Sequence, residues 1–476
     1  MHNYTISKES VRLREELERS NIKFAHWKSN SHLLKSLAGE TDLDLLIKQE
    51  DRTRFESSML QLGYKRLRSQ PWSSYPNVDD WLGLDRETGK FLHVHTHYAL
   101  VTGIQHVKHL HLPWVDVFFD HVIKDEQTGW PIPKPELEVL ILLVRIWAKM
   151  PPSERIHTTP AIPPYIKDEL INLLKNTDPK NLLSLCGELN IVVPNNFLET
   201  IDHIKVNKDA DSIVRISKSL YTQMKPYFKS PWVQSVLKST FFKLNINAFK
   251  YSMRFLGPHK LGKTLNSGGK IIALVGSDGS GKSTLSNDLV KWLTYKMDTH
   301  YFYMGKNPYI KSNNKILLSR TDVFFLDSRV SKALKKFVGS FYYLILIKKK
   351  LTFIRLAKRM STSGSIIICD RFPQKSILGI NDGPNLQKST HSWTSRIEMN
   401  LFDQVNELPP DIVIKLNVSP DTAFERKPQH DKIKIFQKCD ALNNINFKNA
   451  KVVNIDSNQP YDKVLAEIKN EIWNLL

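Results

Sequence analysis

A glycine-rich turn is the strongest chemical signal in the sequence. The stretch IIALVGSDGSGKST at 271–284 has glycines, a lysine and a serine at the spacing of a phosphate-binding loop. Glycines allow left-handed dihedral angles and close approach, so that backbone N–H groups can bind a polyphosphate. Lys282 adds a positive charge near the β- and γ-phosphates, and the Ser283 hydroxyl can bind Mg²⁺. The sequence therefore predicts that ATP and Mg²⁺ are bound by Gly276, Ser277, Asp278, Gly279, Ser280, Gly281, Lys282, Ser283 and Thr284.

Such a loop needs a strand before it and a helix after it. The apolar run at 271–275 predicts a buried strand, and apolar residues at helical spacing over 285–293 predict an amphipathic helix. The N-terminus of that helix points at the loop and favours bound anions. We expect 270–476 to be a P-loop NTPase domain, a three-layer α/β/α fold around a parallel sheet. Its other strands are expected from apolar runs at 365–369, 411–418 and 451–455.

A carboxylate and a guanidinium follow the second of these strands. Asp370 and Arg371 directly follow the run SIIIC. In open α/β sheets, ligands bind at the carboxyl ends of the strands. Asp370 can hold Mg²⁺ together with Ser283, and Arg371 can bind a phosphate. We therefore expect Asp370 and Arg371 to act in catalysis with Lys282; the alternative is a surface ion pair.

Two further basic segments are candidates for binding phosphate groups. Arg355 and Arg359 are four residues apart on a predicted helix and share one face, so they can anchor an acceptor phosphate. A solvated basic face is the alternative. Arg426 begins a basic stretch that continues to Lys438. A cationic segment that closes over a phosphoryl group stabilises its charge and excludes water, so we assign Arg426 to catalysis, with a solvated loop as the alternative.

The order of these parts resembles the thymidylate kinase family of P-loop kinases. The similar segments, which cover most of 270–476, are GSDGSGKST, the Asp370-Arg371 pair, PDIVIKLNVSPDTAFER and the closing NID loop. The resemblance implies that Asp278 contacts the acceptor sugar and that Arg371, with Arg355 or Arg359, binds the acceptor. Members that use dTMP follow the Asp-Arg pair with residues that read thymine. DRFPQKSILGINDGPNL has no counterpart of these residues, and the lid is rich in Lys rather than Arg.

The N-terminal region carries a second acidic motif. Asp42 and Asp44 are two residues apart on a predicted strand, so both carboxylates face the same side and can hold Mg²⁺. With the Lys28-Ser29 turn before it, this α+β region resembles the nucleotidyltransferase fold, which implies a second nucleotide site. Either a histidine of FLHVHTHYAL, Asp85 or Asp116 supplies the third ligand, or the site has no catalytic role. The six histidines at 93–111 also suggest a metal site, because imidazoles bind transition metals. A hairpin of stacked histidines without a metal is the alternative.

The pattern of apolar and polar residues divides the 476-residue chain into parts. We expect a nucleotidyltransferase-like domain at 1–125, a helical region at 126–256, a linker at 257–269 and the kinase-like domain at 270–476. The aromatic and lysine-rich segment 228–256 fits a helix packed between domains or lying on an anionic membrane.

Charge and cysteine content limit the location and the partners. The net charge of +20 suggests a polyanion or an anionic membrane surface, or a lysine-rich composition without a specific partner. No nucleic-acid module accompanies the basic residues. Three widely spaced cysteines and an amphipathic N-terminus predict a cytoplasmic protein, peripheral at a membrane if membrane-bound. The oligomeric state stays open, a homodimer included.

These observations favour an ATP-dependent kinase that transfers a phosphoryl group to a nucleoside monophosphate such as dTMP. A kinase for a sugar or sugar phosphate in surface-glycan synthesis is the first alternative. Nucleotidyl transfer by the N-terminal domain and a non-catalytic ATP-binding regulator are the others. In each kinase hypothesis the second substrate is a small-molecule phosphate acceptor.

Overall fold

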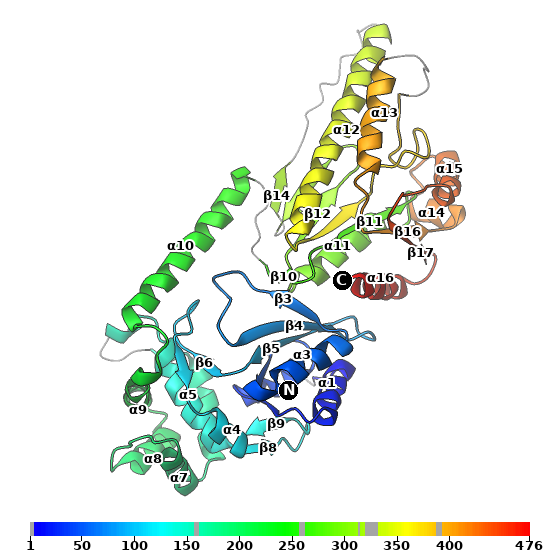
Figure 1. Cartoon of the computed structure of the whole chain (residues 1–476). Helices are drawn as coiled ribbons and strands as arrows, with labels where there is room; N and C mark the ends of the chain where they lie inside the picture. Colours follow the sequence, from blue (N-terminus) through cyan, green and yellow to red (C-terminus); the bar gives the residue numbers. More distant parts are fainter. Residues whose placement is uncertain (1–3, 157–160, 257–261, 313–314, 319–331, 387–392) are drawn as a thin grey trace. The chain divides into compact units, whose positions relative to one another are not determined.

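The computed structural model describes residues 4–156, 161–256, 262–312, 315–318, 332–386 and 393–476. It divides into two compact units (Figure 1). The first consists of Met1–Asp85 and Lys90–Asn247, and the second of Arg86–Gly89 and Ala248–Leu476. The regions expected at 1–125 and 126–256 therefore share the first unit almost entirely. Part of the expected linker, 257–261, lies outside the described residues.

The first unit contains a mixed sheet with helices packed on it. Its neighbouring strands follow the order β1 (Phe24–His26), β2 (Leu43–Ile47), β5 (Phe91–His97), β4 (Val78–Leu84) and β3 (Lys65–Arg68). Strands β2 and β5 are parallel, and the other pairs are antiparallel. Residues of α1 (Lys8–Arg19), α2 (Leu33–Leu37) and α3 (Arg52–Gln61) share one apolar core with β2, β4 and β5.

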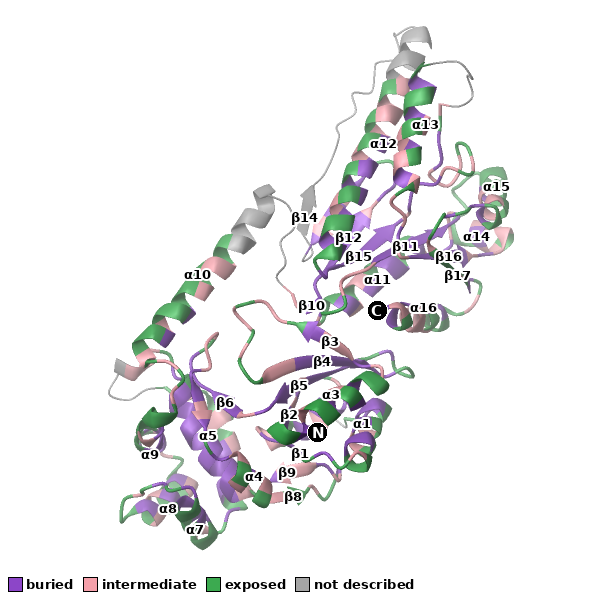
Figure 2. Ribbon diagram, in the orientation of Figure 1, coloured by how far each residue is buried: buried purple, intermediate pink, exposed green. Residues whose placement is uncertain are grey.

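Helices make up most of the remainder of the first unit. Prolines begin three of them, α5 (Pro135–Lys149), α6 (Pro164–Lys175) and α7 (Pro179–Glu188), because a residue in the first turn needs no N–H partner. Helix α5 is buried over most of its length and forms the centre of a second core (Figure 2). The other elements are α4 (Val115–Asp120), α8 (Phe197–Asn207), α9 (Ala210–Gln223), α10 (Trp232–Leu256), of which 232–247 belong to this unit, and the hairpins β6–β7 (Leu100–Thr102, Leu110–Leu112) and β8–β9 (Val122–Lys124, Pro131–Pro133).

The second unit has a mainly parallel sheet. Its strand order is β14 (Lys315–Leu318), β13 (Tyr309–Ser312), β12 (Thr299–Tyr303), β15 (Ile366–Asp370), β11 (Ile271–Gly276), β16 (Ile412–Asn417) and β17 (Lys451–Asp456). All pairs from β12 to β17 in this order are parallel, whereas β13 pairs antiparallel with both β12 and β14. The carboxyl ends of β11 and β15, where the predicted site residues lie, therefore meet at one edge of the sheet.

Helices cover this sheet, and its central strands are apolar because these helices bury them. Every residue of β11 and β15 is buried (Figure 2), as expected for central parallel strands with helices on both faces. Residues Ile271 and Ala273 share a core with apolar residues of α12 and α13. The helices of this unit are α11 (Lys282–Thr294), α12 (Lys332–Thr362), α13 (Trp393–Asn406), α14 (Pro420–Arg426), α15 (Lys432–Asn443) and α16 (Tyr461–Leu475).

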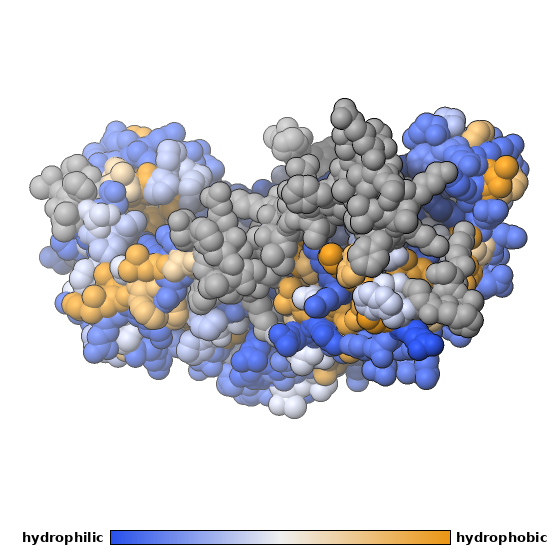
Figure 3. All heavy atoms as spheres, turned by 90° about the horizontal axis from the view of Figure 1, so that it is seen from above, coloured by the Kyte–Doolittle hydropathy of each residue, from blue (hydrophilic) through white to orange (hydrophobic). Residues whose placement is uncertain are grey.

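Most of the visible surface is hydrophilic, although apolar side chains form patches on it (Figure 3). One face of α10 exposes apolar side chains at helical spacing, namely Val233, Leu237, Phe241 and Leu244. Within the described residues, no helix is both long enough and apolar enough to cross a bilayer.

The central strands predict a large effect of core truncation. Ile368 of β15 is fully buried, whereas Ile433 of α15 is 70% exposed. We expect Ile368→Ala to lower the free energy of unfolding of the second unit by about 2–5 kcal/mol, because it leaves a cavity in a packed core. The matched Ile433→Ala change should cost no more than about 0.5 kcal/mol. Urea denaturation of both variants measures the difference; equal losses would contradict this packing.

Candidate functional site

The glycine-rich turn has the backbone geometry of a phosphate-binding loop. Strand β11 ends at Gly276, and α11 begins at Lys282. Gly279 and Gly281 have φ angles of +86° and +87°, which side-chain-bearing residues rarely adopt. A Cβ on Gly276 would lie 2.5 Å from the Ser280 hydroxyl oxygen and 3.0 Å from the Leu416 carbonyl oxygen, so a side chain here would force these groups to shift. The loop thus opens directly onto the N-terminus of a helix, which is a favourable place for a phosphate group.

The Lys282 side chain folds back over the loop. Its ammonium group donates to the Ser277 carbonyl and lies 3.4 Å from the Ser280 hydroxyl. Burial, followed by the positive charge of Arg371, lowers the pKa of Lys282 to about 8. The ammonium therefore has room for further hydrogen-bond partners, and a nearby anion would stabilise its charged form.

The parallel pairing of β11 and β15 brings Asp370 to the start of α11. The Ser283 hydroxyl donates to Asp370 Oδ2 over 2.6 Å, and the Tyr301 hydroxyl donates to the same oxygen over 2.8 Å. The other carboxylate oxygen, Oδ1, is buried without a hydrogen-bond partner. A buried carboxylate oxygen without a donor fits a bound cation, and hydroxyl and carboxylate oxygens are the ligands that Mg²⁺ prefers. Ser283 and Asp370 are thus suitably placed to hold Mg²⁺.

A second carboxylate, inside the loop, is surrounded by cations. Asp278 lies 3.3 Å from Arg371 Nη2 and 3.7 Å from His430 Nδ1, and it also accepts a hydrogen bond from Lys438. Burial alone would raise the pKa of Asp278, but Lys438 and the neighbouring charges outweigh it and hold the pKa well below its usual value. The structure therefore brings together Asp278 and Arg371, which were predicted from separate segments.

Arg371 has a left-handed backbone, with φ of +74°. Its guanidinium lies 3.5 Å from Asp382, whose other oxygen lies 2.9 Å from the Lys350 ammonium. Burial would raise the pKa of Asp382, but Lys350 and Arg371 lower it. Sequence reasoning missed both Asp382 and Lys350. The signal available was the NDG turn after the Asp-Arg pair, because such a turn can return an acidic side chain to the strand end.

Asp278, Arg371, Asp382 and Lys350 line one cavity of about 1260 Å³ in the second unit. Arg355 and Arg359 do not line it: both are exposed on α12, and Arg355 donates to Gln404. Arg426 instead contacts backbone carbonyls, with Nη1 3.0 Å from Ser457 O and 3.4 Å from Gly279 O. The charged and aromatic lining residues include Asp278, Tyr303, Lys306, Tyr342, Tyr343, Lys350, Arg371, Asp382, Glu398, His430, Lys434 and Lys438.

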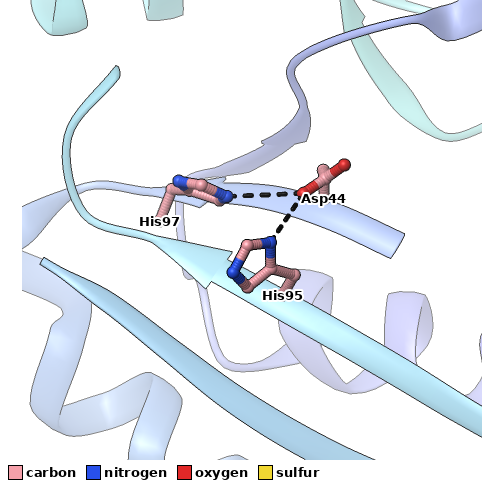
Figure 4. A group of neighbouring side chains, drawn as sticks. All are labelled: Asp44, His95 and His97. Carbon is pink, nitrogen blue, oxygen red and sulfur yellow. Dashed lines mark hydrogen bonds and ion pairs between the residues drawn. The ribbon is translucent and has the colours of Figure 1, made fainter. Parts of the chain in front are cut away.

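In the first unit, the predicted acidic pair has separate partners. Asp42 Oδ1 lies 2.8 Å from His93 Nδ1. Asp44 Oδ1 lies 3.0 Å from His95 Nδ1 and 3.4 Å from His97 Nε2 (Figure 4). The Lys28 ammonium lies 2.7 Å from the same oxygen. Of the six clustered histidines, two therefore meet Asp44. The others contact different groups; for example, His106 pairs with Trp72 O and His109 with the Tyr221 hydroxyl.

Cations gather around Asp44. Burial lowers the pKa of Lys28, although Asp44 opposes that shift. Burial, with Lys28 and Arg145, lowers the pKa of Lys108 to about 8. The pKa of His97 is lowered well below its ordinary value, first by burial and then by Lys28. His97 is therefore neutral at physiological pH, and the positive charges favour an anionic ligand near Asp44.

Comparison with known proteins places the chain in a family. No family model matches the chain. The "uncharacterized ATP-binding protein" YghS of Escherichia coli K12 is 30% identical over 217 residues, which are 41% of this chain and 89% of YghS. The chain belongs to the family of YghS. The ATP-binding protein YghR of the same organism, also named as uncharacterized, is 28% identical over 218 residues, or 42% of this chain and 86% of YghR.

Solved structures with a likeness to this chain include deoxyadenosine kinase from M. mycoides. Its complex with dATP has 15% sequence identity and a TM-score of 0.25, and covers 42% of this chain and 98% of the kinase. The complex with dCMP and dCDP has 17% identity, the same coverage and the same TM-score of 0.25. The assignment of the second unit to a P-loop fold therefore depends on the strand order and loop geometry described above, and not on these low scores.

Lys282 predicts a pH-dependent nucleotide affinity. With a pKa of about 8 in the free protein, its ammonium loses its proton as the pH rises above 8. Because phosphate stabilises the charged form, we expect ADP binding to take up a proton and to weaken between pH 7 and pH 9. Titration calorimetry in buffers of different ionisation enthalpy measures both effects. In the Lys282→Arg variant the side chain stays charged over this pH range, so the pH dependence of the ADP affinity should disappear. If the ADP affinity of that variant still falls with pH as in the unchanged chain, another group causes the dependence.

Proposed function

We propose that the second unit is an ATP-dependent phosphotransferase. In this proposal it transfers the γ-phosphoryl group of Mg·ATP to a nucleoside monophosphate. The observation that carries the proposal is the cavity of about 1260 Å³, which reaches from Asp278 in the phosphate loop to the cations of α12 and α15. A nucleotide-binding switch needs a phosphate loop but no second chamber beside it, whereas a kinase needs room for an acceptor.

The donor side of the site follows from the loop. The backbone N–H groups of 277–283 and the Lys282 ammonium would bind the phosphates of ATP. Ser283 and Asp370 would hold Mg²⁺, which supplies charge neutralisation between the β- and γ-phosphates when it is bound. Arg426 holds the backbone of Gly279 and Ser457, so its role in this proposal is to position the loop.

The acceptor side is defined by charge. The cavity is lined by five lysine and arginine side chains against three carboxylates, and the cations are Lys306, Lys350, Arg371, Lys434 and Lys438. Such an excess favours an anionic acceptor. Two of the carboxylates are already engaged, because Asp278 and Asp382 pair with these same cations. A phosphate group entering the cavity would replace a carboxylate as the partner of Arg371 or Lys350.

Catalysis in this proposal depends on positioning and charge stabilisation. Phosphoryl transfer spreads negative charge over the transferred group, so fixed cations near that group lower the barrier. Arg371 is suitably placed, because its guanidinium lies 3.3 Å from Asp278 in the loop. Lys434 and Lys438 lie on α15, over the loop side of the cavity, and add positive charge there.

Aromatic side chains favour an acceptor with a flat or ring-shaped part. Tyr303, Tyr342 and Tyr343 line the same cavity as the cations. Aromatic rings stack on bases, and they also pack on sugar rings. A nucleoside monophosphate has a base that can stack on the tyrosine rings and a phosphate that can pair with the cations. A sugar phosphate satisfies the charges and belongs in the same acceptor screen.

Loss of the loop lysine should abolish transfer. We expect the full chain to transfer the γ-phosphoryl group of labelled ATP to at least one acceptor from a panel of nucleoside monophosphates and sugar phosphates. Lys282→Ala should lower kcat by about 100- to 1000-fold, since it removes one preorganised cation from the transferring phosphates. Thin-layer chromatography of the products measures this. ATP binding without Lys282-dependent transfer to any acceptor would overturn the proposal.

The two groups of cations on α12 should differ in their effect. Lys350 lines the cavity, whereas Arg355 is exposed and pairs with Gln404. We expect Lys350→Met to raise the acceptor KM about 10- to 100-fold, because one charge-assisted hydrogen bond is lost. Arg355→Met should leave the acceptor KM unchanged. Steady-state kinetics at saturating ATP separates the two.

A control is needed because Lys350 and Asp382 form a buried pair. Removal of one partner leaves an uncompensated charge, which typically costs about 3–5 kcal/mol of stability. The double change Lys350→Met with Asp382→Asn removes both charges and should retain the fold. If this variant is folded and still has the original acceptor KM, Lys350 does not bind the acceptor.

A further inference from the structure

The first unit contains a convergent set of metal-ligating atoms that the kinase proposal does not use. Asp44 on β2 lies directly opposite His95 in the parallel pairing with β5, and His97 follows two residues later on the same face. One ligand atom from each of the three residues lies within 4.8 Å of the others. In Figure 4 both imidazole rings point toward the Asp44 carboxylate. The cluster is therefore held by sheet register and does not depend on a loop.

The separations of Asp44 Oδ1 from the two imidazole nitrogens fit a small metal ion. Nitrogen ligands about 2.0–2.1 Å from a tetrahedral Zn²⁺ lie about 3.3–3.4 Å from one another. Asp44 Oδ1 lies 3.0 Å from His95 Nδ1 and 3.4 Å from His97 Nε2. Small side-chain movements would therefore complete three bonds to one ion. His97 is buried, whereas His95 and Asp44 are partly exposed, so an ion has a way in.

The ligand types identify the class of metal. Two imidazoles and one carboxylate suit zinc and other divalent transition metals, whereas Mg²⁺ prefers oxygen ligands. Asp42, the other carboxylate expected here, lies 2.8 Å from His93 Nδ1, and the convergent group consists of Asp44, His95 and His97. Three protein ligands would leave one position open. The nearby cations Lys108 and Arg145 favour an anionic oxygen ligand in that position.

Lys28 is the main competitor for this site. Its ammonium lies 2.7 Å from Asp44 Oδ1 and 3.4 Å from His97 Nε2, close to where the ion would lie. Two charges of the same sign cannot share this space, so metal binding requires Lys28 to move away. Its long side chain allows this, since only the ammonium needs to swing away from the carboxylate.

We propose that Asp44, His95 and His97 bind a divalent transition-metal ion, and that Lys28 occupies its position in the metal-free chain. The inference is independent of the phosphotransferase proposal, because it concerns the first unit alone. An ordinary network of ion pairs, with no metal, makes different predictions for the variants below.

The test is titration of Zn²⁺ into the full chain after chelator treatment, by calorimetry and by competition with a chromogenic chelator. We expect one equivalent to bind. Loss of a residue that only hydrogen-bonds a metal ligand typically weakens metal binding about 10- to 100-fold. Asp44→Asn and His95→Gln each remove a ligand and should weaken Zn²⁺ binding by more than this. Asp42→Asn is the matched control and should bind as the unchanged chain does. Lys28→Met should bind about tenfold tighter or more, because it removes the competing charge.

Thermal unfolding of each variant shows whether it is folded, and bound Zn²⁺ should raise the unfolding temperature of the unchanged chain. His95→Gln keeps the test decisive if Asp44→Asn does not fold. The proposal is overturned if the unchanged chain binds no stoichiometric Zn²⁺, or if folded His95→Gln binds as tightly as the unchanged chain. Equal losses in Asp42→Asn and Asp44→Asn would overturn it in favour of a carboxylate pair.

Discussion

The parallel pairing of β11 with β15 places a carboxylate opposite the phosphate loop, and the second unit is organised around that pairing. The register pairs Leu274 with Asp370. The loop that follows β11 and the carboxylate at the end of β15 therefore lie close to each other. Ser283 at the start of α11 can therefore reach Asp370. Since both strands are buried between helices, neither can slide without exposing apolar side chains. The distance between the Ser283 hydroxyl and the Asp370 carboxylate is thus fixed by the core.

Around this fixed pair, the charged side chains alternate in sign. Lys438 contacts Asp278, Asp278 contacts Arg371, Arg371 contacts Asp382, and Asp382 contacts Lys350. Each of these buried or partly buried charges has a partner of opposite sign, which limits the cost of taking it out of water. A phosphate that enters can replace a carboxylate without leaving a cation unpaired. The same chain of contacts therefore stabilises the fold and prepares the cavity for an anion.

Local sequence predicted the loop well, because its strand, glycines and helix are contiguous in 271–294. Asp382 and Lys350 could not be found in this way. Asp382 reaches the strand end through residues with left-handed backbones, and Lys350 does so from one face of a long helix. The spacing of Arg355 and Arg359 predicts that they share one face of a helix. It does not predict whether that face points into the cavity or into solvent, because this depends on how α12 packs. The partners of Asp42 and Asp44 come from β5, and strand pairing over about fifty residues leaves no local signal.

The back-folded lysine of the phosphate loop bears on the thermodynamics of binding. The Lys282 ammonium has an oxygen partner within the loop itself, the Ser277 carbonyl. When a nucleotide binds, a phosphate oxygen would replace the Ser277 carbonyl as the partner of the Lys282 ammonium. The Lys282 side chain is already held in the loop. The loop is in this sense preorganised, so that little conformational entropy is lost on binding. Such a site should bind nucleotide more tightly than a site whose loop must first become ordered.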